Sequence, residues 1–260
     1  MWDLKILAAE YYKATYNKIL KKMVMGHLIH ADETKVGLKN EYGYVWVLTT
    51  MEEVLYIYRP TREAGFLHEL LKGFKGILVT DFYPGYDSLE CLKQKCLIHL
   101  IRDLNDALLK NPFDDELKEV VIMFGSLLRK IIDTIDKFGL KSRYMRKHKK
   151  NVKRFYKWLS KQSFNSELAE SFKKRLIKYE KELFLFLDYD NVPWNNNNAE
   201  YAIKYFANYR KNIKGLTTER GLETHLTLLS IYQTCNYKGI NFLDFLLSKE
   251  RDIDKFSLKP

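Results

Sequence analysis

The feature that most constrains the fold is a short apolar run that ends in an acid. Gly76-Ile77-Leu78-Val79-Thr80 leads directly into Asp81, and Pro84-Gly85 breaks the chain soon afterwards. A run of this length between turn signals is typical of a strand buried on both faces. Together with the strands and helices expected around it, this strand predicts an α/β or α+β domain.

Further strand and helix signals surround this run. The spacing of apolar residues predicts a helical lead-in over 1–26, and 27–32 is a short strand candidate ending in Asp32. Residues 44–49 and 54–58 predict antiparallel neighbours, and 95–98 is a further strand candidate. Thr61 is expected to cap a helix that carries Phe66 to Leu71.

The middle of the chain has a different sequence pattern. From about Leu100 to Leu187 every signal is helical, which predicts an all-helical insertion of about residues 100–190. Helices are then expected over 197–210, 218–233 and 242–247. The resulting expectation is a lead-in (1–26), a catalytic domain (27–235) that includes the insertion, and a C-terminal helical tail (236–260).

Composition excludes several classes of protein. Hydrophobic residues make up 46% of 260, so a buried core is expected rather than disorder. No apolar run reaches membrane-spanning length and the start lacks a signal-peptide pattern, which predicts a cytoplasmic protein. The three cysteines, Cys91, Cys96 and Cys235, are scattered and fit reduced thiols.

The net charge of +11 favours a polyanionic partner such as DNA, although the Lys, Asn, Tyr and Ile bias of an AT-rich genome would produce the same charge. The stretch Lys141–Lys161 is more specific, because it holds ten Lys or Arg and no acid. A solvated helix face usually mixes both signs. The candidates for DNA-backbone contact here are Lys150, Lys153, Arg154 and Lys157.

Asp32 and Asp81 each end a strand candidate, where side chains of an open sheet project into a crevice. Two converging carboxylates repel each other unless a cation lies between them, so convergence predicts a divalent metal. The alternative is that any strand ends in Asp, because turns favour it.

Glu200 lies just inside an expected helix, after a Trp and the run Asn195–Asn198. An ion pair with Lys204 one turn later and a simple asparagine N-cap are the bland explanations. Neither explains why this particular series precedes an acid.

These residues carry a resemblance to a known family. The chain resembles the insertion-sequence-66 family of DDE transposases over nearly its whole length, in the family's order. The matching segments are Asp32-Glu33-Thr34, Tyr44–Trp46, Gly76–Tyr86, Cys96–His99 with Arg102, Pro193–Glu200, Arg210–Asn212, Gly221, Thr234–Asn236 and Gly239–Asn241.

The resemblance implies an RNase H-like mixed sheet with a large all-helical insertion before the last catalytic helix. It implies that Asp32, Asp81 and Glu200 hold two Mg²⁺ ions, for which Mn²⁺ can substitute. The implied reaction is hydrolysis at each transposon end followed by 3′-hydroxyl attack on target DNA. The implied partners are transposon ends, target duplex and further copies of the chain assembled on DNA, in the bacterial nucleoid.

The chain also departs from the family. Asn195 stands where Asp is usual, and Tyr201 and Lys204 stand where Arg is usual, which weakens phosphate clamping near the metals. The chain starts close to the catalytic region, without the DNA-binding portion that relatives commonly carry, so a truncated copy is one expectation.

The remaining candidates for DNA contact are His99, Arg102, Lys204, Arg210 and Lys211. Cys96 and His99, even with Cys91, supply too few ligands for structural zinc, so no zinc is expected. His30 is expected to pack or to support the site. Two other functions stay open: an RNase H-like nuclease that cuts without joining, and a catalytically silent relative that binds DNA or a partner transposase.

Overall fold

The computed structural model describes residues 2–39, 41–213 and 215–258. The chain divides into two compact units. We call Met1–Cys91 with Asn196–Pro260 the sheet unit, and Leu92–Asn195 the helical unit. The expected mixed α/β class is confirmed, because the strands lie in the first part of the chain and helices dominate the rest.

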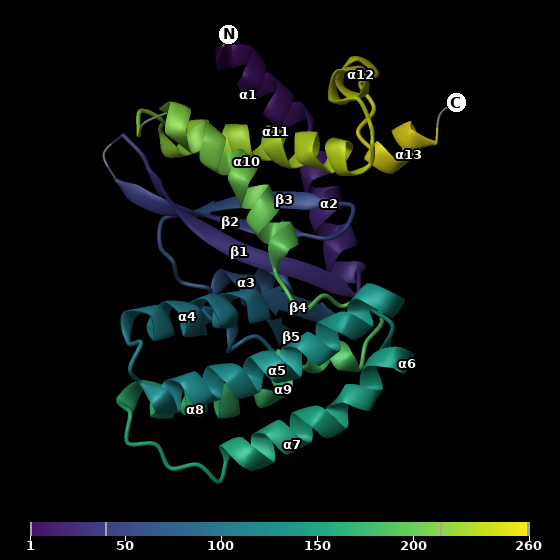
Figure 1. Cartoon of the computed structure of the whole chain (residues 1–260). Coiled ribbons are helices and arrows are strands. Elements are labelled where there is room, and N and C mark those ends of the chain that lie inside the picture. The colour runs from purple at the N-terminus through teal and green to yellow at the C-terminus, as the bar shows by residue number, and fades with distance from the viewer. Residues whose placement is uncertain (1, 40, 214, 259–260) are drawn as a thin grey trace. The chain divides into compact units, whose positions relative to one another are not determined.

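The strands of the sheet unit lie side by side in one mixed sheet (Figure 1). They lie in the order β3-β2-β1-β4, namely β3 (Val54–Arg59), β2 (Tyr42–Thr49), β1 (Leu28–Gly37) and β4 (Ile77–Thr80). β2 is antiparallel to both β1 and β3, as the sequence predicts, whereas β4 is parallel to β1.

β1 corrects one expectation. The first strand was expected to end at Asp32, but it continues to Gly37, so Asp32 lies in mid-strand. The extension follows from pairing with β2, which runs residue by residue from His30↔Thr49 to Gly37↔Tyr42. A partner strand satisfies the backbone groups of polar residues beyond the point where the apolar run stops.

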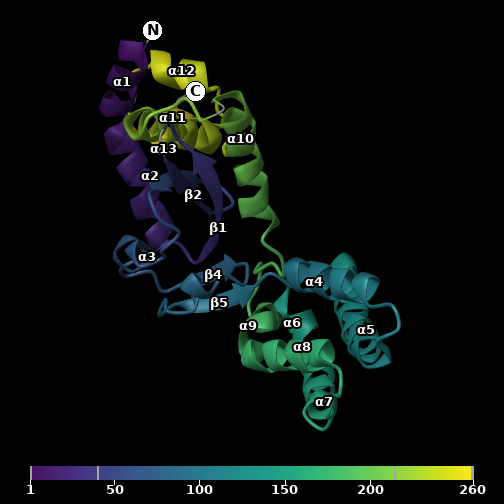
Figure 2. The same ribbon diagram turned by 90° about the vertical axis from the view of Figure 1, so that its left-hand side faces the viewer.

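Helices cover both faces of this sheet. Figure 2 shows α2 and α10 on opposite sides of β1 and β2. The helices and turns of the sheet unit are α1 (Trp2–Tyr11), α2 (Lys13–Met25), α3 (Phe66–Leu70), the 3-10 turn η1 (Pro84–Tyr86), α10 (Asn197–Ile213), α11 (Glu219–Tyr237), α12 (Phe242–Leu247) and α13 (Ile253–Ser257). The lead-in is helical as predicted. The Thr61 cap is wrong, because α3 begins only after Gly65.

Strand alternation separates the core of the sheet unit into two clusters. On one face of the sheet, Ile29 and Ala31 pack in a cluster with Trp46. On the other face, Val36 and Val45 pack against Phe206 of α10 and its neighbours. The face that carries His30, Asp32 and Thr34 is therefore the α10 face.

Glycine permits the close approach of β1 and β4. A Cβ at Gly76 would lie 2.5 Å from the carbonyl oxygen of His27, which is closer than real Cβ contacts allow. The next amide, that of Ile77, donates a 2.9 Å hydrogen bond to the same oxygen. Gly76 therefore fixes where the parallel pair starts.

The helical unit opens with β5 (Leu92–Lys95) and continues with α4 (Leu97–Lys110), α5 (Asp115–Phe138), α6 (Ser142–Met145), the 3-10 turn η2 (Arg146–His148), α7 (Lys149–Leu159), α8 (Glu167–Lys178), α9 (Glu180–Leu183) and the 3-10 turn η3 (Leu185–Leu187). The strand expected over 95–98 lies earlier, at Leu92–Lys95, because α4 already begins at Leu97, with Leu97, Leu100 and Leu104 buried along it. Residues 97–187, all described, contain no strand, as predicted. Among the described helices, none is both long and apolar enough to cross a membrane.

Candidate active site

Asp32 and Asp81 occupy the same level of the parallel strand pair. His30 pairs with Val79, so the same register, continued by two residues, places Asp32 beside Asp81. Adjacent strands lie about 4.8 Å apart. Asp81 directly follows the last residue of β4, and both carboxylates are partly accessible to solvent. The strand register thus brings together two acids that are far apart in sequence.

Asn196 anchors the start of α10 to β1. Its side-chain amide donates a 2.8 Å hydrogen bond to the carbonyl oxygen of Ala31. Its side-chain oxygen lies 3.1 Å from Nδ1 of His30. Asn196 and His30 are both buried, and burial lowers the pKa of His30 to about 4, so the imidazole is neutral at pH 7. Asn196 therefore links the start of α10 to β1. His30, which contacts the Asn196 side chain, supports this link.

Arg210 makes a second anchor farther along the same helix. Its Nη1 donates to Oγ1 of Thr34 and to the carbonyl oxygen of Lys35, at 2.6 Å each. α10 is therefore held to β1 on both sides of Asp32 in sequence. Glu200 lies in the first turn of α10, between the two anchors.

The electrostatics of Asp32 report the proximity of the other acids. Burial, together with the charges of Glu33, Asp81 and Glu200, raises the pKa of Asp32 to about 8, against one backbone N–H bond that lowers it. A carboxyl held among other carboxylates accumulates negative charge that a divalent cation would offset. Three carboxylates also supply the oxygen ligands that Mg²⁺ prefers. The residues that could hold a metal here are Asp32, Asp81 and Glu200, and their chemistry fits that group.

Backbone amides orient two of these carboxylates. Oδ1 of Asp32 accepts the N–H of Glu33 at 2.8 Å, and Oδ1 of Asp81 accepts the N–H of Tyr83 at 2.9 Å. The Glu33 side chain points to the opposite face of β1, where Arg62 and Tyr86 donate to it. Arg62 lies outside the segments that carry the family resemblance, and Tyr83 and Tyr86 lie in one of them without an expected role. The alternation of the Asp-Glu-Thr motif was the available signal.

The basic stretch of the helical unit presents its charge to solvent. Lys150, Lys153, Arg154 and Lys157 are all exposed on α7. The opposing residues Met145, Val152, Phe155 and Leu159 are buried, as their spacing predicts. The stretch is not one helix, however, because α6, η2 and α7 succeed one another. Lys149 is paired with Asp188 and is not part of the free basic face.

The other DNA-contact candidates have different environments. Arg102 is exposed on α4, where His99 is partly buried. Lys204 and Lys211 are exposed on α10. The Arg210 guanidinium instead contacts β1, so the structure gives this residue an anchoring part within the sheet unit.

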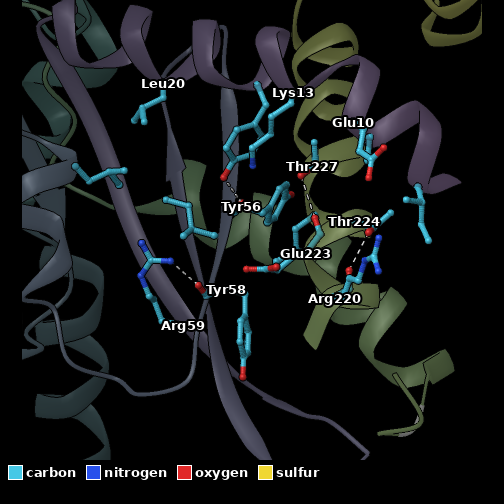
Figure 3. A pocket seen from close by; sticks show the side chains of 16 residues that line it. Glu10, Lys13, Leu20, Tyr56, Tyr58, Arg59, Arg220, Glu223, Thr224 and Thr227 are labelled. Atoms are coloured by element: carbon cyan, nitrogen blue, oxygen red, sulfur yellow. Dashed lines mark hydrogen bonds between the residues drawn. The ribbon is translucent and has the colours of Figure 1, made fainter. Parts of the chain in front are cut away.

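A separate hollow of about 580 Å³ lies between α1, α2, β3 and α11 (Figure 3). It is lined by charges of both signs, such as Glu10, Lys13, Arg59 and Glu223. The Tyr16 hydroxyl, which donates a 2.9 Å hydrogen bond to the carbonyl oxygen of Tyr56, helps to close it. Its size suits a small ligand, but Asp32, Asp81 and Glu200 do not line it. This hollow and the carboxylate site are thus different places.

Comparison with known proteins adds independent information. The chain is 26% identical over 261 residues to "Uncharacterized protein y4qI" of Sinorhizobium fredii (strain NBRC 101917 / NGR234). The match covers 88% of this chain and 48% of that relative, so the chain spans about half of the relative's length. No solved structure matches the chain.

The family comparison covers Asp32, Asp81 and Glu200 together. The sequence model of the transposase IS66 family matches residues 3–224, which include β1 to β4, the helical unit and α10. The chain therefore belongs to the transposase IS66 family.

Proposed function

We propose that this chain is the catalytic part of a DNA transposase, in which Asp32, Asp81 and Glu200 bind two Mg²⁺ ions. The observation that carries the proposal is the β1–β4 register, which puts Asp32 level with Asp81 when it is continued by two residues. The charges of Asp81 and Glu200, which both act on Asp32, support it. Family membership supports the reaction class. The order β3-β2-β1-β4, with β4 parallel to β1, supports an RNase H-like sheet into which the helical unit is inserted.

When bound, the two metal ions activate the attacking oxygen and stabilise the leaving oxygen of an in-line displacement. The protein's own part is to position the ligands. The Glu33 and Tyr83 amides aim Asp32 and Asp81, and the Asn196 and Arg210 anchors hold α10 with Glu200. Water attacks a phosphodiester at the transposon end, and the freed 3′-hydroxyl then attacks the target strand without a covalent enzyme intermediate.

In this proposal the chain binds DNA through contacts between its basic side chains and the phosphates of the DNA backbone. The exposed basic side chains of α7 are its main carriers, together with Arg102, Lys204 and Lys211. Lys and Arg near phosphates release counterions, which drives association without reading the base sequence. Copies of the chain assemble on the two transposon ends.

The test is a joining assay with purified protein. Duplex oligonucleotides from the DNA that flanks the gene, pre-cut to expose a 3′-hydroxyl, are incubated with a supercoiled plasmid and Mg²⁺ or Mn²⁺. We expect joining by the unaltered chain and none by Asp32→Asn, Asp81→Asn or Glu200→Gln. Glu90→Gln, an exposed carboxylate on the segment after β4, is the matched control and should join normally.

Two other outcomes identify the alternatives. Metal-dependent cutting without joining would mean a nuclease. DNA binding with no affinity for Mn²⁺, and with triad variants identical to the unaltered chain, would mean a catalytically silent relative.

A further inference from the structure

A ring of contacts on the face opposite Asp32 connects the two aspartates. Glu33 is almost completely buried, with 2% of its side chain exposed. Its Oε1 accepts hydrogen bonds from Nε and Nη2 of Arg62, at 2.8 and 2.6 Å. Its Oε2 accepts the Tyr86 hydroxyl at 2.7 Å. Both oxygens are thus already bonded, so Glu33 is not placed to be a metal ligand.

The ring of contacts continues through Arg62 to the loop that bears Asp81. Its guanidinium lies 4.2 Å from the ring centre of Tyr83, and its carbonyl oxygen accepts the Tyr83 hydroxyl at 2.7 Å. The amide of the same tyrosine donates to Asp81. Tyr83 is therefore held by its side chain while its backbone orients the aspartate.

The ring closes through Glu33. Its amide orients Asp32 while its side chain binds Arg62 and Tyr86. Tyr83 and Tyr86 also stack edge to face, with ring centres 5.8 Å apart, and Trp46 packs 5.8 Å from Tyr86. The two residues whose amides aim the two aspartates are thus joined to each other by one arginine.

We propose that Glu33 and Arg62 are positioning residues that fix the separation of the Asp32 and Asp81 carboxylates. The proposal rests on the proposed function for its metal, but the ring itself does not require one. Groups that orient metal ligands typically change metal affinity or activity by 10–100-fold when they are replaced. The charge pair of the buried Glu33 carboxylate with Arg62, and the tyrosine that both contact chains share, make this clamp stiffer than either backbone hydrogen bond alone.

The variant that tests it is Arg62→Ala, which removes a half-exposed side chain and should leave the core folded. Mn²⁺ titration calorimetry on the full chain should show about tenfold weaker binding with unchanged stoichiometry. Arg62→Lys, which keeps the charge but loses the fork, should recover part of the affinity. Arg59→Ala is the matched control, because Arg59 also stacks on an aromatic ring, that of Phe66, and should leave Mn²⁺ affinity unchanged.

A second measurement does not depend on the metal. Amide hydrogen exchange of residues 81–86 in metal-free protein should be faster in Arg62→Ala than in the unaltered chain and in Arg59→Ala. Unchanged exchange and unchanged Mn²⁺ affinity in Arg62→Ala would overturn the positioning role. Loss of one bound Mn²⁺ in Glu33→Gln would also overturn it, because Glu33 would then be a ligand. If the unaltered chain binds no Mn²⁺, the proposed function fails, and exchange at 81–86 alone decides the inference.

Discussion

In the sheet unit, the distinctive charges are acidic and withdrawn from solvent, whereas those of the helical unit are basic and exposed. Asp32 lies in mid-strand with its pKa raised by burial and neighbouring acids. Lys150, Lys153 and Lys157 are exposed to solvent, and the opposite side of their helix is a buried apolar stripe. Buried like charges are costly and need a partner, whereas exposed like charges cost little and attract polyanions. The two units thus keep opposite charges apart: acids withdrawn from solvent in one and exposed bases in the other.

The largest effect is expected from Asp32→Asn. In saturating Mg²⁺ the joining rate should fall roughly 10³-fold, because metal stabilisation of the transition state is worth several kcal/mol. Without metal, the same variant should unfold at a higher temperature than the unaltered chain, since one of several neighbouring negative charges is gone. With Mn²⁺ at 100 times its Kd, the unaltered chain should gain about 2.7 kcal/mol that the variant lacks. Thermal unfolding with and without Mn²⁺ measures this reversal. If Asp32→Asn were less stable than the unaltered chain in both conditions, Asp32 would not be a site of unfavourable charge repulsion.

The next effect concerns the basic surface. Replacing Lys150, Lys153, Arg154 and Lys157 by Gln should lower the slope of log K against log salt by up to about 3.6, at about 0.9 per lost phosphate contact. At physiological salt this corresponds to up to roughly a thousandfold weaker duplex binding, whatever the sequence. Fluorescence anisotropy at several salt concentrations measures the slope.

The matched control for this surface is α5, which mixes both signs of charge. Gln at its exposed Lys118, Arg129, Lys130 and Lys137 removes the same number of charges from the same unit. That variant should keep the original slope. Equal losses in both variants would show that net charge, rather than the acid-free face, drives binding.

A smaller effect is expected at the helix anchor. Asn196→Ala removes two buried hydrogen-bonding groups opposite Ala31 and His30, which should cost about 2 kcal/mol of unfolding free energy. Mn²⁺ affinity should fall as well, because Glu200 follows on the freed turn. Urea unfolding and Mn²⁺ calorimetry measure the two effects. Asn208→Ala, exposed on the same helix, should change neither; a loss of stability with unchanged Mn²⁺ affinity in Asn196→Ala would separate the anchor from the site.

The smallest effect tests buried charge without any metal. His225 is stacked on Tyr209 with ring centres 3.5 Å apart, and burial lowers its pKa to about 4. A folded pKa below the unfolded value of about 6.5 means that protons bind the unfolded chain better. Its contribution to stability is therefore complete above about pH 6.5 and is lost as the pH falls toward 4. In His225→Gln this loss of stability between pH 6.5 and pH 4 should be smaller than in the unaltered chain, as urea unfolding at the two pH values would measure.

Much of the fold follows from local pattern. The buried run before Asp81 predicted β4, and helical periodicity predicted the long helical stretch. Two β-branched and aromatic runs separated by a tight acidic turn predicted β2 and β3 as antiparallel neighbours. The predicted ends of some strands and helices were wrong where tertiary contacts outweighed the local composition. β1 runs on past Asp32 because β2 supplies its hydrogen bonds, and Leu97 starts a helix because Leu100 and Leu104 share its buried side.

The sequence by itself determined which acids to compare, because strand and helix signals marked Asp32, Asp81 and Glu200. It also determined the basic face of α7, since the side chains of one helix share a face by spacing alone. Only the tertiary structure decided that β1 and β4 pair in parallel, that Asn196 clamps α10 to β1, and that Arg62 links Glu33 to Tyr83. The physical reason is distance along the chain. Local periodicity fixes which side chains share a face, whereas contacts between residues many positions apart depend on strand pairing and on which buried polar groups find partners.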